Sequence, residues 1–378
     1  MIKRTGAELT IALLERQGIT HIAGIPGGAN LPLYDALSRS KIRHILARHE
    51  QGAGFMAQGM ARASGRPAVC FATSGPGATN VLTALADAKL DSIPVVCITG
   101  QVPLPLIGSD AFQEVDIYGM SLPVTKHNFL VRSIEELLEV IPSAFRIAAS
   151  GRPGPVLIDI PKDVQLAELA FPEWPQPGQA DVAAAATPVE IEAAARAIEQ
   201  AERPILYLGG GVVHAGGAEL ARTFAEHCDL PTVMTLMALG VLAQDHPLSL
   251  GMLGMHGAEA TNHALQRSDL LIAVGARFDD RATGKVAEFC PKAKVVHLDI
   301  DASELHKVRR ADYPMAGDVV PTLQALLECL PRHTRAGWRD EIATLQYFHP
   351  APNWGADIAH PQDLIQSVAR CLGPDAIV

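Results

Sequence analysis

The chain has 378 residues, of which 48% are hydrophobic and 19% are charged, so it is too apolar to be disordered and long enough for roughly two or three domains. Its net charge of −10 and the lack of a basic tract argue against nucleic acid or an anionic membrane as a partner. The six cysteines have no metal-ligand spacing and are expected to be reduced thiols in a cytoplasmic protein. No signal peptide and no apolar run of about 18 residues is evident, so we expect no membrane span.

The first part of the sequence alternates between helix and strand signals. Thr5 and Glu8 have the spacing of a capping box, which predicts a helix that ends near Gly18. Buried strands are predicted at residues 19–25, 42–47, 67–73 and 93–99, with helical segments between them. Short apolar strands separated by helices are typical of a parallel sheet that is covered on both faces. We therefore predict a doubly wound α/β domain over residues 1–168.

A second α/β domain is predicted after a break in this pattern. Residues 169–188 are rich in Pro, Gly and Ala without a strand period, which predicts an interdomain linker. Alternation then resumes, and we predict a second doubly wound domain over residues 189–330. Its predicted helix is at 188–201 and its predicted strands are at 204–210, 230–236, 269–276 and 293–300.

The end of the sequence predicts the start of a third domain. Residues 331–360 are interpreted as a connector, and residues 361–378 as the beginning of the next domain. One helix at 360–372 and part of a strand at 375–378 cannot close a hydrophobic core. The sequence therefore predicts a chain that is truncated at the start of this third domain.

Every predicted strand of the first domain is followed by a polar or glycine-rich loop. Ligands in open α/β sheets bind beyond the carboxyl ends of the strands, so the loops together predict one ligand-binding rim. Gly27, Gly28, Gly75 and Gly77 would let the backbone approach a ligand closely. Each loop alone is weak evidence, because turns from strand to helix are often rich in glycine. The loops are residues 24–30, 47–53, 72–80 and 98–103.

A carboxylate, Glu50, stands where an apparent core strand meets an apparent core helix. Burial of an unpaired charge costs several kcal/mol, so Glu50 is expected to have a partner or a function. The alternative is an acid at a helix N-terminus, where the helix dipole favours it.

Several long segments resemble one family. The first-domain segments are similar to the pyrimidine-binding domain of thiamin-diphosphate enzymes, and in particular of acetolactate (acetohydroxyacid) synthase large subunits. Two second-domain segments resemble the same family, and the resemblance runs from about residue 4 to the end. The segments are RHEQGA, ATSGPGATN, DSIPVVCITGQVP, IGSDAFQE and SGRPGPVLIDIPKD in the first domain, and LGMLGMHG and GARFDDRATGK in the second.

The resemblance implies roles for residues of the first domain. Glu50 would hydrogen-bond a ring nitrogen of the cofactor's aminopyrimidine and so promote deprotonation of the thiazolium carbon. Phe112 and Gln113 would line the space above the thiazolium, and Lys162 would lie near the substrate entrance. On the residues alone, Phe112 could be a core residue, and Lys162 and Arg152 could be solvated surface residues. The implied cofactor-binding residues are Gly27, Gly28, Ala29, Ser74, Pro76, Asn80 and Arg152, the last as a flavin contact.

In the second domain the residues alone leave a nucleotide site open. The segments LGGG at 208–211 and DID at the strand end 299–301 suit a dinucleotide, but no strict GxGxxG is present. The resemblance implies a bound FAD that does no net redox work in the carboligation. It also implies that Arg281 faces the second 2-ketoacid. A guanidinium group can bind the carboxylate of that substrate through two parallel hydrogen bonds. On the residues alone, His256 could be a packed loop residue and 279–281 a surface salt-bridge cluster. The implied FAD contacts are Gly210, Gly211, His256, Gly257, Gly275, Arg277, Asp299 and Asp318.

The sequence departs from the family pattern in one respect. The GDG(S/A) motif and the later Asn pair, which hold Mg²⁺ and the diphosphate, are missing from these 378 residues. We therefore predict part of an acetolactate synthase catalytic subunit, a transferase of branched-chain amino-acid biosynthesis that decarboxylates pyruvate and joins the product to pyruvate or 2-ketobutyrate. Thiamin diphosphate, FAD and Mg²⁺ are its implied cofactors. Its implied partners are a second copy, in a homodimer or dimer of dimers, and a small regulatory subunit. Residues 1–378 alone are predicted to be inactive.

Two alternatives remain at this stage. The first is another FAD-holding relative, such as a pyruvate oxidase or a glyoxylate carboligase. Glu50 argues against the carboligase, which lacks this acid, and Arg281 argues against the oxidase, which needs no second ketoacid. The second alternative is a non-catalytic module that binds flavin or partners, which the missing metal motif would favour.

Overall fold

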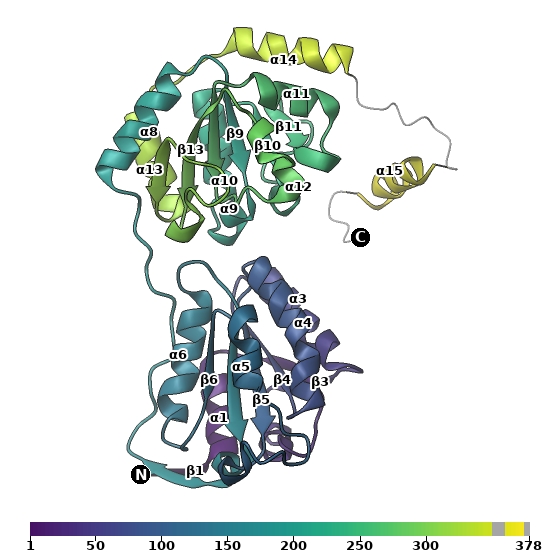
Figure 1. Cartoon of the computed structure of the whole chain (residues 1–378), viewed down its shortest axis with the longest axis vertical. Coiled ribbons are helices and arrows are strands. Elements are labelled where there is room, and N and C mark those ends of the chain that lie inside the picture. The colour runs from purple at the N-terminus through teal and green to yellow at the C-terminus, as the bar shows by residue number, and fades with distance from the viewer. Residues whose placement is uncertain (350–359, 374–378) are drawn as a thin grey trace. The chain divides into compact units, whose positions relative to one another are not determined.

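The fold is a chain of two compact α/β units, residues 1–183 and 184–378 (Figure 1). The computed structural model describes residues 1–349 and 360–373, so the strand predicted at 375–378 lies outside the described residues. The predicted fold class, with two doubly wound parallel-sheet domains, is confirmed. No helix within the described part of the chain is long and apolar enough to cross a membrane.

The first unit contains a six-stranded sheet with the order β3-β2-β4-β5-β7-β6. All neighbouring strands in it are parallel. Because β2 lies between β3 and β4, the winding reverses beside β2, which is the topological switch point where α/β sheets bind ligands. The strands are β2 (His21–Gly24), β3 (Arg43–Leu46), β4 (Ala68–Ala72), β5 (Val95–Gln101), β6 (His127–Leu130) and β7 (Val156–Pro161).

Helices cover both faces of this sheet. Alternate strand residues pack against α1, α2 and α6 on one face and against α3, α4 and α5 on the other. The predicted capping box is present, with Glu8 N donating to Thr5 Oγ1 and Thr5 N donating to the Glu8 carboxylate. The helices are α1 (Gly6–Arg16), α2 (Leu31–Ser38), α3 (Glu50–Ser64), α4 (Pro76–Leu90), α5 (Ile117–Ser121), α6 (Leu137–Ala149) and α7 (Lys162–Leu166).

Part of the segment that we interpreted as a linker belongs to the first unit. Strand β8 (Glu168–Phe171) pairs in antiparallel fashion with β1 (Ile2–Thr5). Phe171 is buried, and its ring meets that of Trp174 edge to face at 4.8 Å. These apolar side chains cover the core of the first unit, so the chain leaves this unit only near residue 183.

The second unit is also doubly wound, with every neighbouring pair parallel, but its strand order β11-β10-β9-β12-β13-β14 differs from that of the first unit. Its switch point lies between β9 and β12. The outer strands β11 and β14 were not predicted, because each is short and contains Gly or Pro. The strands are β9 (Pro204–Leu208), β10 (Thr232–Met234), β11 (Ser249–Met252), β12 (Leu270–Val274), β13 (Lys294–Asp299) and β14 (Tyr313–Ala316).

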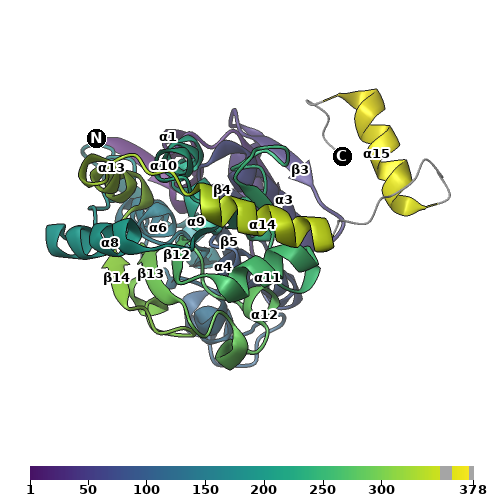
Figure 2. The same ribbon diagram turned by 90° about the horizontal axis from the view of Figure 1, so that it is seen from above.

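Helices also cover both faces of the second sheet. Helices α8, α10 and α13 pack on one face, and α11 and α14 pack on the other, where α14 runs beside α11 (Figure 2). The predicted helix at the end of the chain forms α15. The helices are α8 (Pro188–Gln200), α9 (Gly210–His214), α10 (Ala218–Cys228), α11 (Glu259–Arg267), α12 (Asp280–Thr283), α13 (Val319–Cys329), α14 (Ala336–Phe348) and α15 (Pro361–Leu372).

Helix α14 lies in the stretch that we interpreted as a connector. Trp338, Ile342 and Leu345 are buried in the core of the second unit, and Trp338 Nε1 donates a hydrogen bond to Pro204 O at 3.0 Å. Their spacing of four and three residues places them on one helical face. Residues 336–348 therefore form a helix that belongs to the second unit.

Candidate cofactor and substrate sites

Glu50 begins helix α3, directly after the edge strand β3. His49 caps this helix, because its Nδ1 accepts a hydrogen bond from Gln51 N at 3.1 Å. Glu50 is half-buried, and Asn80 Nδ2 on the adjacent α4 donates to Glu50 Oε2 at 3.0 Å. Glu50 thus occupies the first position of a helix, as the alternative interpretation supposed, and also has the polar partner that burial requires.

The loops after β2 and β4 lie on the two sides of the first switch point. Ala29 N donates to Thr73 Oγ1 at 3.3 Å, which ties one loop to the other. A Cβ placed at Gly27 would lie 2.6 Å from the Thr73 side chain, and one placed at Gly77 would lie 2.7 Å from it. A Cβ at Gly28 would meet nothing within 4 Å. Of these glycines, only Gly28 leaves open space for a ligand, whereas the others allow the protein to pack against itself.

Ser74, Pro76 and Gly75 complete the loop after β4. Ser74 is buried, and Pro76 is exposed at the start of α4. Gly75 has a φ of +57°, and a Cβ there would lie 2.6 Å from the backbone oxygen of Gln113. The loop that carries Phe112 and Gln113 therefore lies against the loop after β4.

Phe112 itself is 88% exposed, so it is not a core residue. The loop around it is held by Glu114, whose carboxylate accepts hydrogen bonds from Gly108 N and Ala111 N. These backbone hydrogen bonds, with that of Gly108 the strongest, lower the pKa of Glu114. The fold thus presents a large aromatic side chain to the surroundings on a fixed loop.

A buried acid that we did not predict lies at the carboxyl end of the same sheet. Asp159 on β7 is 1% exposed, and its carboxylate accepts from Thr99 Oγ1 at 2.7 Å and from Gln101 Nε2 at 3.0 Å. Burial raises the pKa of Asp159 to about 7, although these hydrogen bonds lower it. Gln101 Nε2 also donates to Val115 O at 3.0 Å. The network therefore joins β5, β7 and the segment that follows Phe112.

Lys162 is the half-buried first residue of helix α7, which is hydrogen-bonded to the loop after β2. In this helix, Gln165 Nε2 donates to Ala29 O at 2.8 Å and to Ile160 O at 2.7 Å. Arg152 is placed differently, because it precedes β7 and lies at the amino end of that strand. Its Nε donates to Ser92 Oγ at 2.9 Å. Arg152 and Glu50 are therefore at opposite ends of the strands of one parallel sheet.

Two glycine-rich loops meet at the switch point of the second unit. Gly211 N donates to Gly275 O at 3.0 Å. A Cβ at Gly211 would lie 2.7 Å from Gly275 Cα, and one at Gly275 would lie 2.8 Å from Gly211 Cα. Gly210 is close to Met237, whose Cβ would be 3.0 Å from an added Cβ. These glycines were expected to admit a pyrophosphate, but Gly211 and Gly275 are required by the contact of the loops with each other.

The implied acidic residues lie together at the ends of β13 and β14. Asp299 is largely buried, and its Oδ1 accepts from Asp301 N at 2.9 Å. Gly317 N donates to Asp299 O at 3.0 Å, and the next residue, Asp318, caps α13 by accepting from Val320 N at 2.8 Å. An acid at a strand end next to a glycine-rich switch point suits the hydroxyl groups of a ribose.

Arg281 and His256 lie on neighbouring segments near α12. Both are exposed, and Arg281 Nη1 is 4.0 Å from Met255 Sδ. Asp279 caps α12 by accepting from Arg281 N at 3.0 Å, so this acid serves the helix and not a side-chain salt bridge to Arg281. Gly257 follows His256 and needs to be small, since a Cβ there would lie 2.4 Å from Met252 O.

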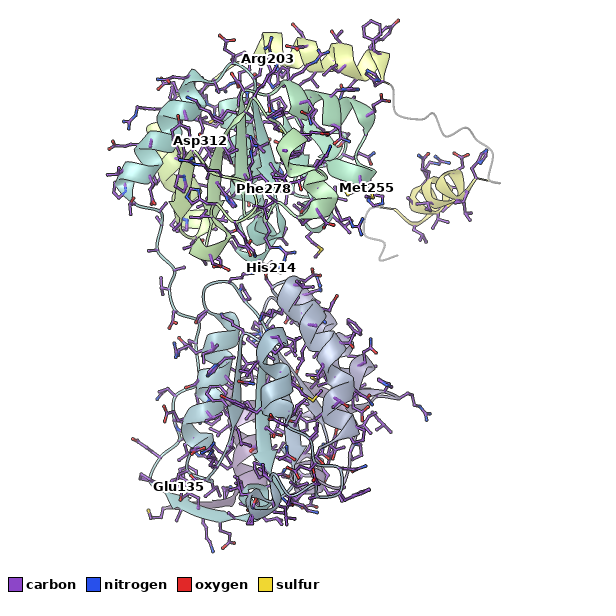
Figure 3. The ribbon with its side chains drawn as sticks, viewed as in Figure 1. Glu135, Arg203, His214, Met255, Phe278 and Asp312 are labelled. Carbon is purple, nitrogen blue, oxygen red and sulfur yellow. The ribbon has the colours of Figure 1, made fainter. Side chains whose placement is uncertain are left out.

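Phe278, which we did not predict, fixes the loop that carries Arg277. It is buried in the second unit (Figure 3) and has a φ of +56°, a strained conformation for a residue with a side chain. Its ring meets those of Tyr207 at 5.5 Å and His297 at 5.0 Å. Burial raises the pKa of Tyr207 and lowers that of His297, which keeps both uncharged. The buried ring of Phe278 thus fixes the backbone next to Arg277, which is half-buried.

Comparison with protein families identifies the two units. Residues 4–120 match the "Thiamine pyrophosphate enzyme, N-terminal TPP binding domain", and residues 191–326 match the "Thiamine pyrophosphate enzyme, central domain". The chain belongs to the thiamine pyrophosphate enzymes. Glu50, Asn80 and Phe112 lie within the N-terminal match of this thiamine pyrophosphate enzyme, and the loops of Gly211 and Gly275 lie within the central match.

Curated relatives of this thiamine pyrophosphate enzyme are acetolactate synthases, so the predicted resemblance is confirmed. The chain is 57% identical to the acetolactate synthase isozyme 1 large subunit of Escherichia coli K12, over 99% of the chain and 66% of the relative. It is 48% identical to the acetolactate synthase large subunit of Corynebacterium glutamicum, over 99% of the chain and 62% of the relative. The chain thus spans just under two thirds of the length of these relatives.

Proposed function

We propose that the protein to which this chain belongs is the large catalytic subunit of an acetolactate synthase. It would decarboxylate pyruvate and join the resulting two-carbon unit to pyruvate or 2-ketobutyrate, in the biosynthesis of branched-chain amino acids. The observation that carries the proposal is the Glu50–Asn80 pair at the rim of a domain that matches a TPP-binding domain. The 57% identity to a large subunit of this name favours it over an oxidase or a glyoxylate carboligase.

The residues of the first unit fit the pyrimidine part of thiamin diphosphate. When bound, this cofactor supplies a thiazolium carbon that loses a proton and attacks the carbonyl group of a 2-ketoacid. Glu50 would hold a proton at a pyrimidine ring nitrogen, and its hydrogen bond from Asn80 keeps the carboxylate oriented for that task. The open space at Gly28 would accept the ring without a change in the fold.

The second unit would hold FAD, and its donor set fits a dinucleotide. Backbone groups of the two switch-point loops face the carboxyl end of the sheet, and Asp299 could accept from ribose hydroxyl groups. Arg277 and Asp318 lie beside these elements. The assignment of His256, Gly257 and Arg152 to the flavin remains a proposal from the family resemblance.

Arg281 would bind the carboxylate of the second 2-ketoacid. The guanidinium is exposed, and its helix is fixed by the Asp279 cap, so the side chain is available for a charge-assisted pair. Lys162, Phe112 and Gln113 would line the approach to the reacting carbon. We also propose Mg²⁺ as a cofactor of the whole protein, self-association into a homodimer or dimer of dimers, and a small regulatory subunit, since relatives are named large subunits.

The substitution Glu50→Gln in the whole protein tests this function. It keeps the size of the side chain and the contact with Asn80 but removes the proton relay, so acetolactate formation should fall by about a hundredfold or more. Binding of thiamin diphosphate, measured separately by calorimetry, should persist. Glu135→Gln, at an exposed acid of the same unit, is the matched control and should leave turnover unchanged (Figure 3). Turnover near that of the unsubstituted protein in Glu50→Gln would refute the role of Glu50.

A further inference from the structure

Three side chains that could bind a metal meet where α11 and α14 lie side by side (Figure 2). Glu259 and His263 are one turn apart on α11, and His349 directly follows α14. Glu259 Oε1 is 3.5 Å from His263 Nε2 and 3.2 Å from His349 Nδ1. One ligand atom of each residue lies within 4.8 Å of those of the other two. The two histidines therefore converge on the same carboxylate oxygen.

These separations suit a small divalent ion. Zinc binds nitrogen and oxygen ligands at about 2.0–2.2 Å, so two ligand atoms of a tetrahedral site lie roughly 3.3 Å apart. The two distances from Glu259 are close to that value before any ion is present. Two imidazoles and one carboxylate suit zinc and its neighbours in the first transition row better than magnesium or calcium, which prefer oxygen ligands.

The alternative is a pair of ordinary hydrogen bonds from histidine to glutamate. The imidazole rings are 4.6 Å apart and inclined by 38°, and each neutral ring could donate one N–H to the shared carboxylate oxygen. A single metal ion would instead be bound by the lone pairs of both neutral imidazoles and of the carboxylate, and the titration described below distinguishes the two arrangements. A site with three protein ligands also leaves a position for water.

We propose that Glu259, His263 and His349 form a binding site for a divalent transition metal such as Zn²⁺, which fastens the end of α14 to α11. Helix α14 is already held to the core by Trp338, Ile342 and Leu345. The metal would hold His349, which directly follows the helix, to α11, so binding should stabilise the second unit. None of the three ligands belongs to the residues that we assign to the cofactors or substrates.

Titration of the 378-residue chain with Zn²⁺ alone, followed by calorimetry, tests the site. We expect one ion per chain at this position and a rise in the unfolding temperature of the second unit. His263→Ala and Glu259→Gln should each weaken this binding by about tenfold or more and abolish the thermal shift. His263 and Glu259 have exposed side chains, so these variants should remain folded, which circular dichroism would verify.

A matched control is available in the same unit. His246 Nε2 is 3.1 Å from Glu226 Oε1, which is the same kind of pair, and the described residues offer it no third ligand. His246→Ala should therefore bind Zn²⁺ as the unsubstituted chain does. The proposal is wrong if the folded chain binds no Zn²⁺, or if His263→Ala and Glu259→Gln bind it as well as His246→Ala does.

Discussion

Both units are doubly wound parallel α/β sheets, but they differ in strand order and in what lies at their switch points. In the first unit, side chains of neighbouring helices converge beside the switch point, and Gly28 leaves space in front of the sheet. In the second unit the two loops touch each other through Gly211 and Gly275, and the largely buried Asp299 lies at the end of β13. The switch point of the first unit thus leaves space beside a hydrogen-bonded carboxylate, whereas the loops of the second unit close against each other.

The buried acid Asp159 of the first unit gives the largest expected effect, which is a dependence of the stability of that unit on pH. Asp159 keeps its proton in the folded chain up to a pH of about 7, whereas an unfolded aspartate loses it near 3.8. The folded state thus binds more protons between these values, so its stability falls as the pH rises, by roughly 4 kcal/mol in all. Asp159→Asn should remove this fall, which urea unfolding of the first unit at several pH values would measure.

The exposed Asp35 provides the control for that experiment. Asp35→Asn keeps the buried acid, so the stability of its first unit should still decline between pH 4 and pH 7. If Asp159→Asn shows the same decline as Asp35→Asn, another group is responsible for it.

The glycines give the second expected difference. Gly275→Ala would place a methyl group 2.8 Å from the backbone of Gly211 at a φ of +59°, so the second unit should lose about 2–3 kcal/mol of stability. Gly28→Ala meets open space and should change the stability of the first unit by less than about 0.5 kcal/mol. Thermal unfolding of both variants would compare them, and equal losses would contradict the distinction between packed and open glycines.

Phe112 gives the smallest expected effect on stability. Its side chain is 88% exposed, so Phe112→Ala should change the free energy of unfolding by less than about 0.5 kcal/mol. If its ring lines the substrate approach, the variant of the whole protein should show an altered product ratio with pyruvate and 2-ketobutyrate. Phe348→Ala, at another exposed phenylalanine, is the control and should leave that ratio unchanged. A loss of stability in Phe112→Ala would show that the ring packs against the protein.

The sequence predicted most of the apolar strands, including the edge strand β3, but not the strands β6, β11 and β14 at the other sheet edges. Apolar runs such as AVCFA and LLIAV have only one stable place in an α/β fold, which is the centre of a sheet. Strands β6, β11 and β14 carry polar, Gly or Pro residues, so their pairing depends on the neighbouring strand. Helix α14 was missed because the apolar spacing of Trp338, Ile342 and Leu345 lies in an otherwise polar stretch.

In the candidate site, single unusual residues could be predicted from the sequence, but their contacts with distant residues could not. Glu50 was selected as a candidate because a carboxylate between apolar segments is unusual, and the same argument would have selected Asp159 within VLIDIP. The partner of Glu50 was identified only in the fold, since Asn80 approaches through the packing of α3 against α4. His263 and His349 are distant in sequence and meet only because α14 packs on α11.

The pairing of β1 with β8 has a consequence for the order of events during synthesis. Ile2 of β1 pairs with Phe171 of β8, so β1 has no partner until almost the whole unit has been translated. The parallel sheet can assemble in the meantime, because its strands follow one another along the chain. Closure of β1 onto β8 would then be a late event in the maturation of the nascent chain, and a pause in translation before residue 171 would leave this first strand exposed to chaperones.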